Sequence, residues 1–177
     1  MHYMCRCAVS VDNAASRTSK MSPMKITNLA TAPEHIPTIA AWHHAQWGYL
    51  NPGTTLEARI EKMQRYLKGA AIPAMYICVD GEHLAGTAAL VESDMDSHPE
   101  LSPWLASVYV NPDYRNRGVG AALVKYVVSQ AKAHSFSPLY LFTPDQARFY
   151  QSMGWEFIAQ ESYRGGEATL MKIDTTR

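Results

Sequence analysis

"NPDYRNRGVGAALVKY" (residues 111–126) joins two segments of different periodicity. The preceding residues 104–110, WLASVYV, are β-branched and aromatic, as in a strand. From Gly118 to about residue 133 the apolar residues follow helical spacing, which predicts an amphipathic helix. A strand pattern at 138–143 comes next, so the whole segment has the length of a parallel strand–helix–strand crossover.

The loop inside this crossover predicts an anion-binding site. A helix that begins here leaves several backbone N–H groups unpaired, and their partial positive charge attracts anions. Gly118 and Gly120 lack side chains, so a bulky ligand can approach the backbone, and Arg115 and Arg117 add formal charge. A phosphate or pyrophosphate fits this pattern. A glycine-rich helix start beside solvent-facing arginines is the alternative.

Two familiar phosphate motifs do not fit the loop. A P-loop has Gly-Lys-Ser/Thr, whereas Ala121 and Ala122 follow Gly120. The dinucleotide fingerprint has a third glycine where Leu123 stands, and it opens a domain instead of following several hairpins. A nucleotide-binding regulator of either kind is therefore not expected.

Strand and helix patterns on both sides of the crossover predict a mixed α/β (α+β) fold. Asp80–Gly81 is a hairpin signal between two strand patterns. The predicted order is β-α-α-β-β-β-α-β-α-β-β, a central, mostly antiparallel sheet of about seven strands with helices on both faces. The strands are predicted at 24–30, 73–79, 82–92, 104–110, 138–143, 155–160 and 167–174, and the helices at 32–48, 54–69, 118–133 and 144–154.

Size and composition bound the function classes. The chain has 177 residues, 47% hydrophobic and 18% charged, with 16 Lys+Arg against 16 Asp+Glu. No global basic field draws it to nucleic acid or to an anionic membrane. No apolar run reaches the roughly 20 residues of a membrane span. The three cysteines make no disulfide framework, so a reducing cytoplasm is the expected location. We expect one domain at 24–177 after a disordered leader at 1–23.

Cysteine and histidine spacing predicts neither a disulfide framework nor a metal site. Cys5 and Cys7 lie in the predicted leader without obvious partner ligands, and Cys78 lies in a strand pattern. We therefore expect no metal ion.

Two motifs together resemble the GNAT superfamily of N-acetyltransferases. The core motif of that family is Arg/Gln-x-x-Gly-x-Gly/Ala, and residues 115–120 read Arg-Asn-Arg-Gly-Val-Gly. Downstream, ARFYQSMGWEF resembles the family's helix and strand with a tyrosine and a glycine–aromatic pair, here Tyr150, Gly154 and Trp155. The order of elements matches over about residues 24–174. The resemblance implies a GNAT-like fold whose fourth and fifth strands splay apart, with a bulge that opens the slot.

The resemblance also implies acetyl-CoA as acyl donor. Its pyrophosphate would lie on the glycine loop, and its pantetheine arm would pair with the strand before it. Thr143 stands where the family often has an asparagine that touches pantetheine, so that contact is altered. The implied cofactor-binding residues are Val108, Tyr109, Val110, Arg115, Asn116, Arg117, Gly118, Val119, Gly120, Ala121, Thr143 and Tyr150.

For the catalytic step, the resemblance gives Tyr150 as the acid that protonates the departing sulfur; core packing is the alternative role. A backbone N–H within 108–110 would polarise the thioester carbonyl. A general base is sought among Glu92, Asp94, Asp96, His98 and Glu100, with Glu92 and Asp96 as first choices, although a solvated acidic loop is an equally good interpretation.

Aromatic and histidine residues of the first helix have two interpretations. Trp42, Trp47, Tyr49 and Trp104 are candidates for an acceptor pocket, with core packing as the default. His43 shares an apolar stripe, which favours a buried, hydrogen-bonded histidine over a catalytic one.

Two function classes remain. The first is an N-acetyltransferase that acts by direct attack in a ternary complex on a small-molecule or peptide amine. The second is a non-catalytic sensor module that binds coenzyme A or an acyl-CoA. The acidic segment 92–100 favours a cationic acceptor, and a homodimer is an open expectation.

Overall fold

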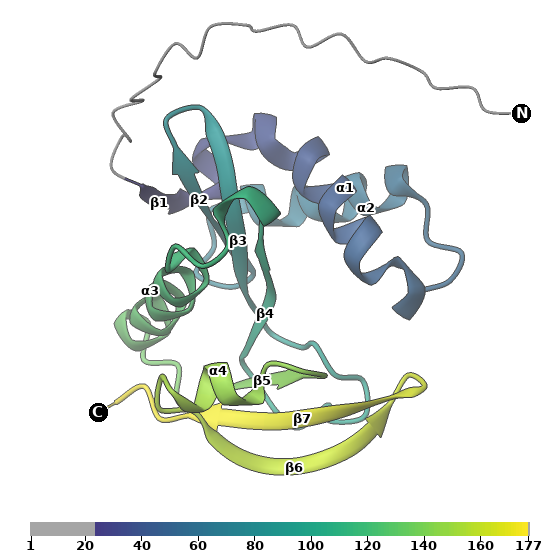
Figure 1. The fold of residues 1–177 in the computed structure, drawn as a ribbon, viewed down its shortest axis with the longest axis vertical. Helices are drawn as coiled ribbons and strands as arrows, with labels where there is room; N and C mark the ends of the chain where they lie inside the picture. The colour runs from purple at the N-terminus through teal and green to yellow at the C-terminus, as the bar shows by residue number, and fades with distance from the viewer. Residues whose placement is uncertain (1–23, 177) are drawn as a thin grey trace, which may run out of the picture.

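The computed structural model describes residues 24–176. The predicted leader, with Cys5 and Cys7, lies outside the described residues. Seven strands form one sheet in the order β1-β2-β3-β4-β5-β7-β6, in which β4 and β5 are parallel and the other neighbours antiparallel (Figure 1). The strands are β1 (Lys25–Asn28), β2 (Ala74–Asp80), β3 (His83–Val91), β4 (Trp104–Val110), β5 (Leu139–Thr143), β6 (Glu156–Tyr163) and β7 (Gly166–Ile173).

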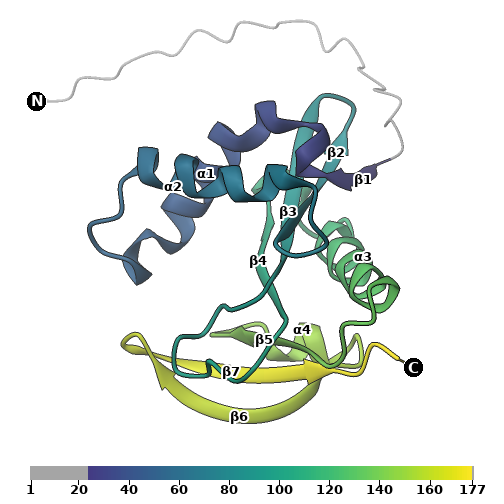
Figure 2. The same cartoon turned by 180° about the vertical axis from the view of Figure 1, so that it is seen from behind.

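Helices cover both faces of this sheet, and each face has its own buried core. The helices are α1 (Ile36–Trp47), α2 (Leu56–Met63), α3 (Val119–Ala133) and α4 (Ala147–Gln151). One core packs α3 and α4 against the sheet through Leu123 and Val127 of α3 and Tyr150 of α4. The other packs α1 and α2 through Ile39 and Met63 (Figures 1 and 2). The predicted fold class and element order are confirmed.

Local signals explain where these elements begin and turn. Thr55 caps α2, because its side chain accepts a hydrogen bond from the Ala58 N–H. The predicted hairpin joins β2 to β3, and Gly81 adopts the left-handed φ of 60° that its turn requires. The second helix differs from its prediction: α2 ends at Met63, and residues 64–68 continue as a 3-10 helix.

β4 and β5 meet only at one end. Trp104 and Tyr140 form their single register pair, supported by a hydrogen bond of 3.0 Å from the Tyr140 N–H to the Pro103 carbonyl. Beyond this point the two strands diverge. A register shift in β3 between Thr87 and Ala89 and a left-handed Ser107 (φ 54°) mark a bulge opposite the divergence. The predicted splay of the fourth and fifth strands is confirmed.

Candidate active site

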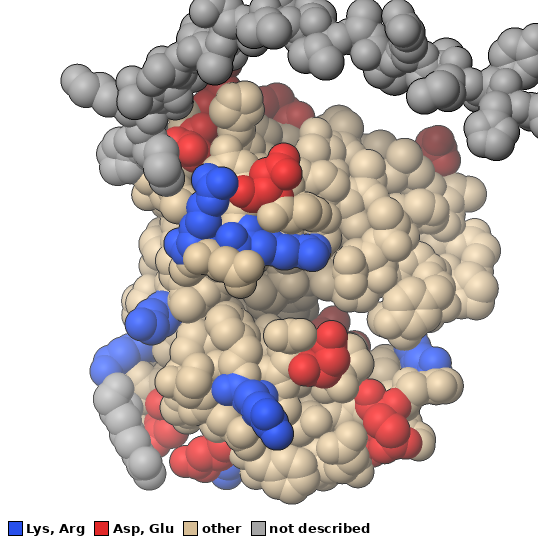
Figure 3. Space-filling view, viewed as in Figure 1, with Lys and Arg blue, Asp and Glu red and all other residues tan. Residues whose placement is uncertain are grey.

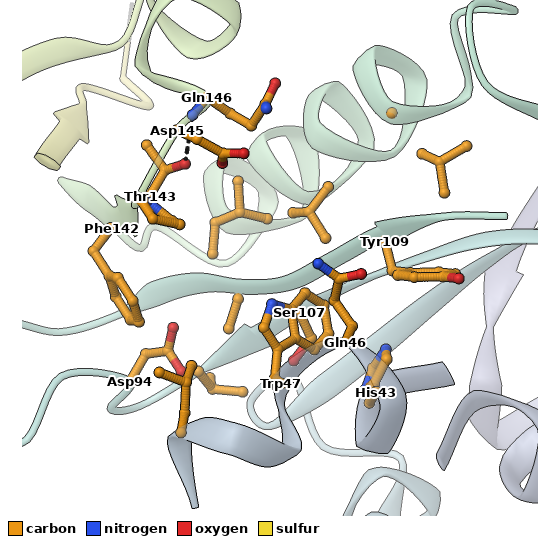
Figure 4. A pocket seen from close by; sticks show the side chains of 18 of the residues that line it. His43, Gln46, Trp47, Asp94, Ser107, Tyr109, Phe142, Thr143, Asp145 and Gln146 are labelled. Carbon is orange, nitrogen blue, oxygen red and sulfur yellow. Dashed lines mark hydrogen bonds between the residues drawn. The ribbon is translucent and has the colours of Figure 1, made fainter. Parts of the chain in front are cut away.

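The divergence of β4 and β5 opens into a cleft of about 1310 Å³. One side of it is formed by β4, the loop that leads into α3, and the end of β5; the other is formed by α1, α2, residues 93–96 and the β6–β7 turn. Figure 3 shows the surface hollowed between the two halves of the molecule, with basic side chains gathered above the hollow, where β4 runs toward α3. Figure 4 shows side chains from α1, β4 and the end of β5 converging on this space.

The glycine loop lies along the cleft in a conformation that exposes its amides. Asn116 (φ 59°) and Gly118 (φ 78°) are both left-handed, and Gly118 is the N-cap of α3. Such a turn before a helix points successive N–H groups toward one region. A Cβ at Gly120 would lie 3.4 Å from Val110 Cγ2 and 3.5 Å from Phe149 Cζ, in ordinary contact, so the loop backbone packs close to both side chains here.

The two arginines of the loop point to different places. The Arg115 Nε donates to the Val110 carbonyl at 3.3 Å, which holds the guanidinium at the end of β4 beside the cleft. Arg117 lies over the Tyr114 ring, 5.3 Å from its centroid, and lines a second, smaller cavity. All the implied cofactor-binding residues except Arg117 line the cleft.

The edge of β4 that faces the cleft is free of strand pairing. Tyr109 and Val110 pair with β3, whereas Val108 lies in the bulge; because β5 pairs with β4 only at Trp104, residues 108–110 have no strand partner on the cleft side. Backbone N–H and C=O groups at such an edge can bind an extended ligand. The free edge at residues 108–110 and the glycine loop together fit an elongated molecule that carries a diphosphate at the loop.

Tyr150 of α4 reaches the cleft while 8% of it is exposed. Burial, and then the negative charge of Asp145, raise the pKa of its phenol well above its usual range. The phenol therefore keeps its proton at neutral pH. The Thr143 hydroxyl accepts a hydrogen bond of 3.0 Å from the Gln146 N–H, so it braces the start of α4 (Figure 4).

The acidic segment does not place its carboxylates together. Glu92 is exposed and does not line the cleft. Asp96 accepts a 3.0 Å hydrogen bond from Arg164 Nη2, which lowers the pKa of its carboxyl. His98 Nδ1 contacts Glu100 and its Nε2 contacts Glu161 at 2.8–2.9 Å, away from the cleft.

Asp94 is the carboxylate of this segment that turns inward (Figure 4). It lies on the floor of the cleft, closely surrounded by protein, and this burial raises the pKa of its carboxyl to about 6 despite the opposing charges of Arg65, Arg164 and Lys62. A carboxylate with such a pKa is suited to accept a proton near neutral pH. The sequence named Asp94 among five residues, but it could not tell which side chain faces inward.

His43 is buried and hydrogen-bonded, as its apolar stripe predicts. Its Nε2 lies 3.0 Å from Thr87 Oγ1, and the Thr87 hydroxyl donates to the Ser107 carbonyl at 3.0 Å. Thr87 has one proton, so His43 Nε2–H is the donor to it. Burial, with a smaller effect of Arg59, lowers the pKa of His43 to about 3. This chain of contacts ties α1 to the bulge of β4.

The aromatic candidates divide between core and cleft. Trp104 is fully buried, and its Nε1 donates to the Leu101 carbonyl at 2.7 Å. Trp42 packs on Tyr109 with ring centroids 5.1 Å apart. Trp47 and the 70% exposed Tyr49 line the cleft.

Four cations that the sequence analysis missed also line the cleft: Arg59 and Lys62 of α2, Arg65 just after it, and Arg164 of the β6–β7 turn. Charged residues on a helix are normally assigned to its solvent face, so no sequence signal marks these side chains. Among residues 24–176, no three His, Cys, Asp or Glu side chains are grouped as metal ligands. None of the described helices is long and apolar enough to cross a membrane.

Comparison with known proteins agrees with this geometry. Residues 72–157 match the model of an acetyltransferase (GNAT) domain, whereas no curated protein has a significantly matching sequence.

Solved structures share the fold at low sequence identity. One is yncA of Salmonella typhimurium, described as a candidate acetyltransferase and solved with its cofactor acetyl-CoA. The two sequences are 18% identical, the alignment covers 86% of this chain and 94% of yncA, and the TM-score is 0.64. An aminoglycoside 6'-acetyltransferase type Ii has 15% identity, covers 86% of this chain and 98% of its own, and has a TM-score of 0.68. The spermidine/spermine N-acetyltransferase SpeG of Vibrio cholerae, in mutant forms, has 13% identity, coverages of 86% and 95%, and a TM-score of 0.65.

Residues 72–157 are therefore identified as a GNAT acetyltransferase domain, and residues 24–176 around and within it have the seven-stranded fold of GNAT acetyltransferases.

Proposed function

We propose that the protein is an acetyl-CoA-dependent N-acetyltransferase that acts on a primary amine of a small molecule or peptide, by direct attack in a ternary complex. One observation carries the proposal: the slot between β4 and β5, the glycine loop and the protonated Tyr150 all border one cleft. The neighbours named for spermidine and aminoglycoside acetylation are consistent with a small-molecule amine. Residues 24–177 would act as a single domain in the cytoplasm, without a metal ion.

The cleft offers a suitable group for each part of the donor. The amides of 116–120 and the Arg115 guanidinium would hold the diphosphate, and the free edge of 108–110 would pair with the pantetheine arm. Acetyl-CoA supplies the acetyl group as a thioester. An N–H on the same β4 edge would bind the carbonyl oxygen of that thioester. The contacts from His43 through Thr87 to Ser107 hold this part of β4 in place.

Tyr150 and Asp94 would manage the protons. An alkylamine has a pKa near 10 and arrives mostly as an ammonium ion, so it must lose a proton before it attacks. Asp94 would accept that proton, directly or through water, because its pKa of about 6 leaves it ionised at neutral pH. It takes this role in preference to Glu92, which is outside the cleft, and to Asp96, which is paired with Arg164. The Tyr150 hydroxyl would donate its proton to the leaving sulfur as the C–S bond breaks, and it would regain a proton from the nitrogen, which loses its second proton as the amide forms.

The direct experiment measures thiol release from acetyl-CoA against a panel of amines, with the acetylated amine identified by mass spectrometry. Release that depends on the amine supports the transferase. Tight binding of coenzyme A by calorimetry, without release for any amine, would favour the sensor module instead.

A further inference from the structure

The acceptor side of the cleft has a surplus of positive charge. Arg59, Lys62 and Arg65 line it, and none of the three is in an ion pair among the described residues. The nearby carboxylates are mostly engaged: Asp96 pairs with Arg164, and Glu167 accepts a 2.7 Å hydrogen bond from the Ser162 hydroxyl. Asp94 is not in an ion pair among the described residues, and the charges of Arg65, Arg164 and Lys62 act on its carboxyl.

Two of these cations have buried donors without a protein acceptor. The Nε atoms of Arg59 and Arg65 are buried, and neither has a hydrogen-bond partner. A buried N–H without a partner is costly, and such groups are usually satisfied by water or a ligand. Both side chains are half-buried at the cleft, where an anion can reach their guanidinium groups.

The Arg65 guanidinium is also held in place before any ligand binds. It lies over the Tyr66 ring, 4.9 Å from the centroid, and its Nη2 donates to the Tyr66 hydroxyl at 3.0 Å. A fixed, planar guanidinium is well suited to bind a carboxylate or phosphate through two parallel hydrogen bonds. The buried His43 near Arg59 is neutral, so it adds no positive charge of its own.

From this arrangement we infer that the acceptor carries an anionic group, a carboxylate or a phosphate, which Arg59 and Arg65 bind while the amine lies toward Asp94. The inference rests on the proposed N-acetyltransferase function and names the substrate class of the same site. It also revises the expectation of a purely cationic acceptor that the acidic segment suggested.

Matched pairs of acceptors test the inference. Straight-chain amino carboxylates, from glycine to aminohexanoate, are each compared with the alkylamine of equal length, and phosphoethanolamine is compared with ethylamine. We expect the best anionic acceptor to exceed its partner about tenfold or more in kcat/KM, because it gains charge-assisted hydrogen bonds.

The variants Arg59→Gln and Arg65→Gln should each lower this preference ratio about tenfold, through the loss of one such contact. Lys68→Gln removes a charge from an exposed position outside the cleft and should keep the wild-type ratio. A ratio compares two substrates on the same variant, so partial misfolding cancels. Equal use of plain amines by wild type, or a ratio unchanged in both arginine variants, would overturn the inference while leaving the transferase intact.

A binding measurement separates the two proposals if no acceptor is acetylated. The protein loaded with coenzyme A is titrated with the same pairs by calorimetry. Amino carboxylates or phosphoethanolamine that bind wild type but not Arg65→Gln would support the anion site and reject the transferase. No binding to wild type would overturn both.

Discussion

Tyr150 is buried but borders the cleft, and both properties suit it to act as a proton donor to the leaving sulfur. Its raised pKa keeps the phenol protonated, so the hydroxyl can donate a hydrogen bond to the sulfur as negative charge develops there. A thiolate leaving group, with a conjugate pKa of about 8.5, gains most from a donated hydrogen bond as its charge develops.

The variant Tyr150→Phe should therefore lower turnover by roughly 10²- to 10⁴-fold, the usual contribution of a general acid, while coenzyme A binding falls far less. Steady-state kinetics and calorimetry measure the two effects. Tyr140→Phe is the matched control, since Tyr140 is a half-buried tyrosine of β5 outside the cleft. Turnover equal to wild type in Tyr150→Phe would assign this side chain to packing against Trp155, whose ring centroid lies 5.9 Å away.

The carboxyl of Asp94 predicts the acidic limit of activity. Its pKa of about 6 means that the base is ionised above this pH and protonated below it, so kcat/KM should fall as the pH drops through about 6. In Asp94→Asn the fall of kcat/KM at acidic pH (the acidic limb of the pH profile) should disappear, and kcat/KM at pH 7 should be roughly 10²-fold lower.

Glu92→Gln and Asp96→Asn test the alternative bases in the same pH series. A limb that persists in Asp94→Asn but vanishes in one of these two would transfer the role of base to that residue.

At the scale of elements, the close contact between β3 and β4 depends on a glycine. A Cβ at Gly86 would lie 2.6 Å from the Tyr109 carbonyl oxygen, closer than real contacts allow, and 3.1 Å from Leu123 Cδ1. The neighbour in conflict is backbone of the strand that forms the slot, so it cannot move freely.

We therefore expect Gly86→Ala to destabilise the fold by about 1–3 kcal/mol, as overpacked sites do, and to weaken coenzyme A binding by shifting residues 108–110. Urea unfolding and calorimetry measure these effects. Gly166→Ala serves as control, because a Cβ there meets nothing nearer than 4.0 Å. Unchanged stability and binding in Gly86→Ala would mean that β4 adjusts without cost.

The order of elements was predictable because each element has a strong local signal. The strand-to-helix change of period around Gly118, the Asp80–Gly81 turn and the alternating or continuous apolar runs all act within a few residues. The end of α2 was less predictable, since the short 3-10 segment that follows it depends on packing. The helix α4 is also shorter than predicted, Ala147–Gln151 within the expected 144–154.

The sequence did not predict which side chains of irregular segments point into the cleft. Residues 92–100 carry five titratable groups, and only the folded loop shows that Asp94 points inward while Met95 beside it is buried in the core. The direction of Arg59 and Arg65 depends in the same way on how α2 packs against α1.

At the scale of the whole molecule, side-chain contacts close the acceptor side of the cleft. Arg164, in the β6–β7 turn, donates to the Leu50 carbonyl at 3.0 Å, to Asn51 Oδ1 at 2.7 Å and to Asp96 Oδ2 at 3.0 Å. His98 connects the segment after β3 to Glu161 of β6. These contacts join segments that are distant in sequence around the cleft.

The His98 contacts predict a pH-dependent contribution to stability. Hydrogen bonds with Glu100 and then Glu161 raise the pKa of His98 above its usual 6.5. A raised folded-state pKa means that the stabilisation is fully present below about pH 6.5 and is lost as the pH rises through the folded value. The contacts are partly exposed, so the effect should be of the order of 1 kcal/mol or less.

Urea unfolding of wild type and His98→Gln from pH 5.5 upward measures this contribution, since the difference between the two proteins removes the effect of other groups, Asp94 included. The difference should shrink toward zero above the raised pKa. A difference that is constant or grows with pH would contradict the proposed charged contacts.

The central claim is that the slot between β4 and β5 holds acetyl-CoA for transfer. A crystal structure of the protein with coenzyme A tests it most directly. We predict the diphosphate on residues 116–120, the pantetheine arm along residues 108–110, and the sulfur within hydrogen-bonding distance of the Tyr150 hydroxyl. Coenzyme A bound at another surface, or with its sulfur pointing away from Tyr150, would contradict the account.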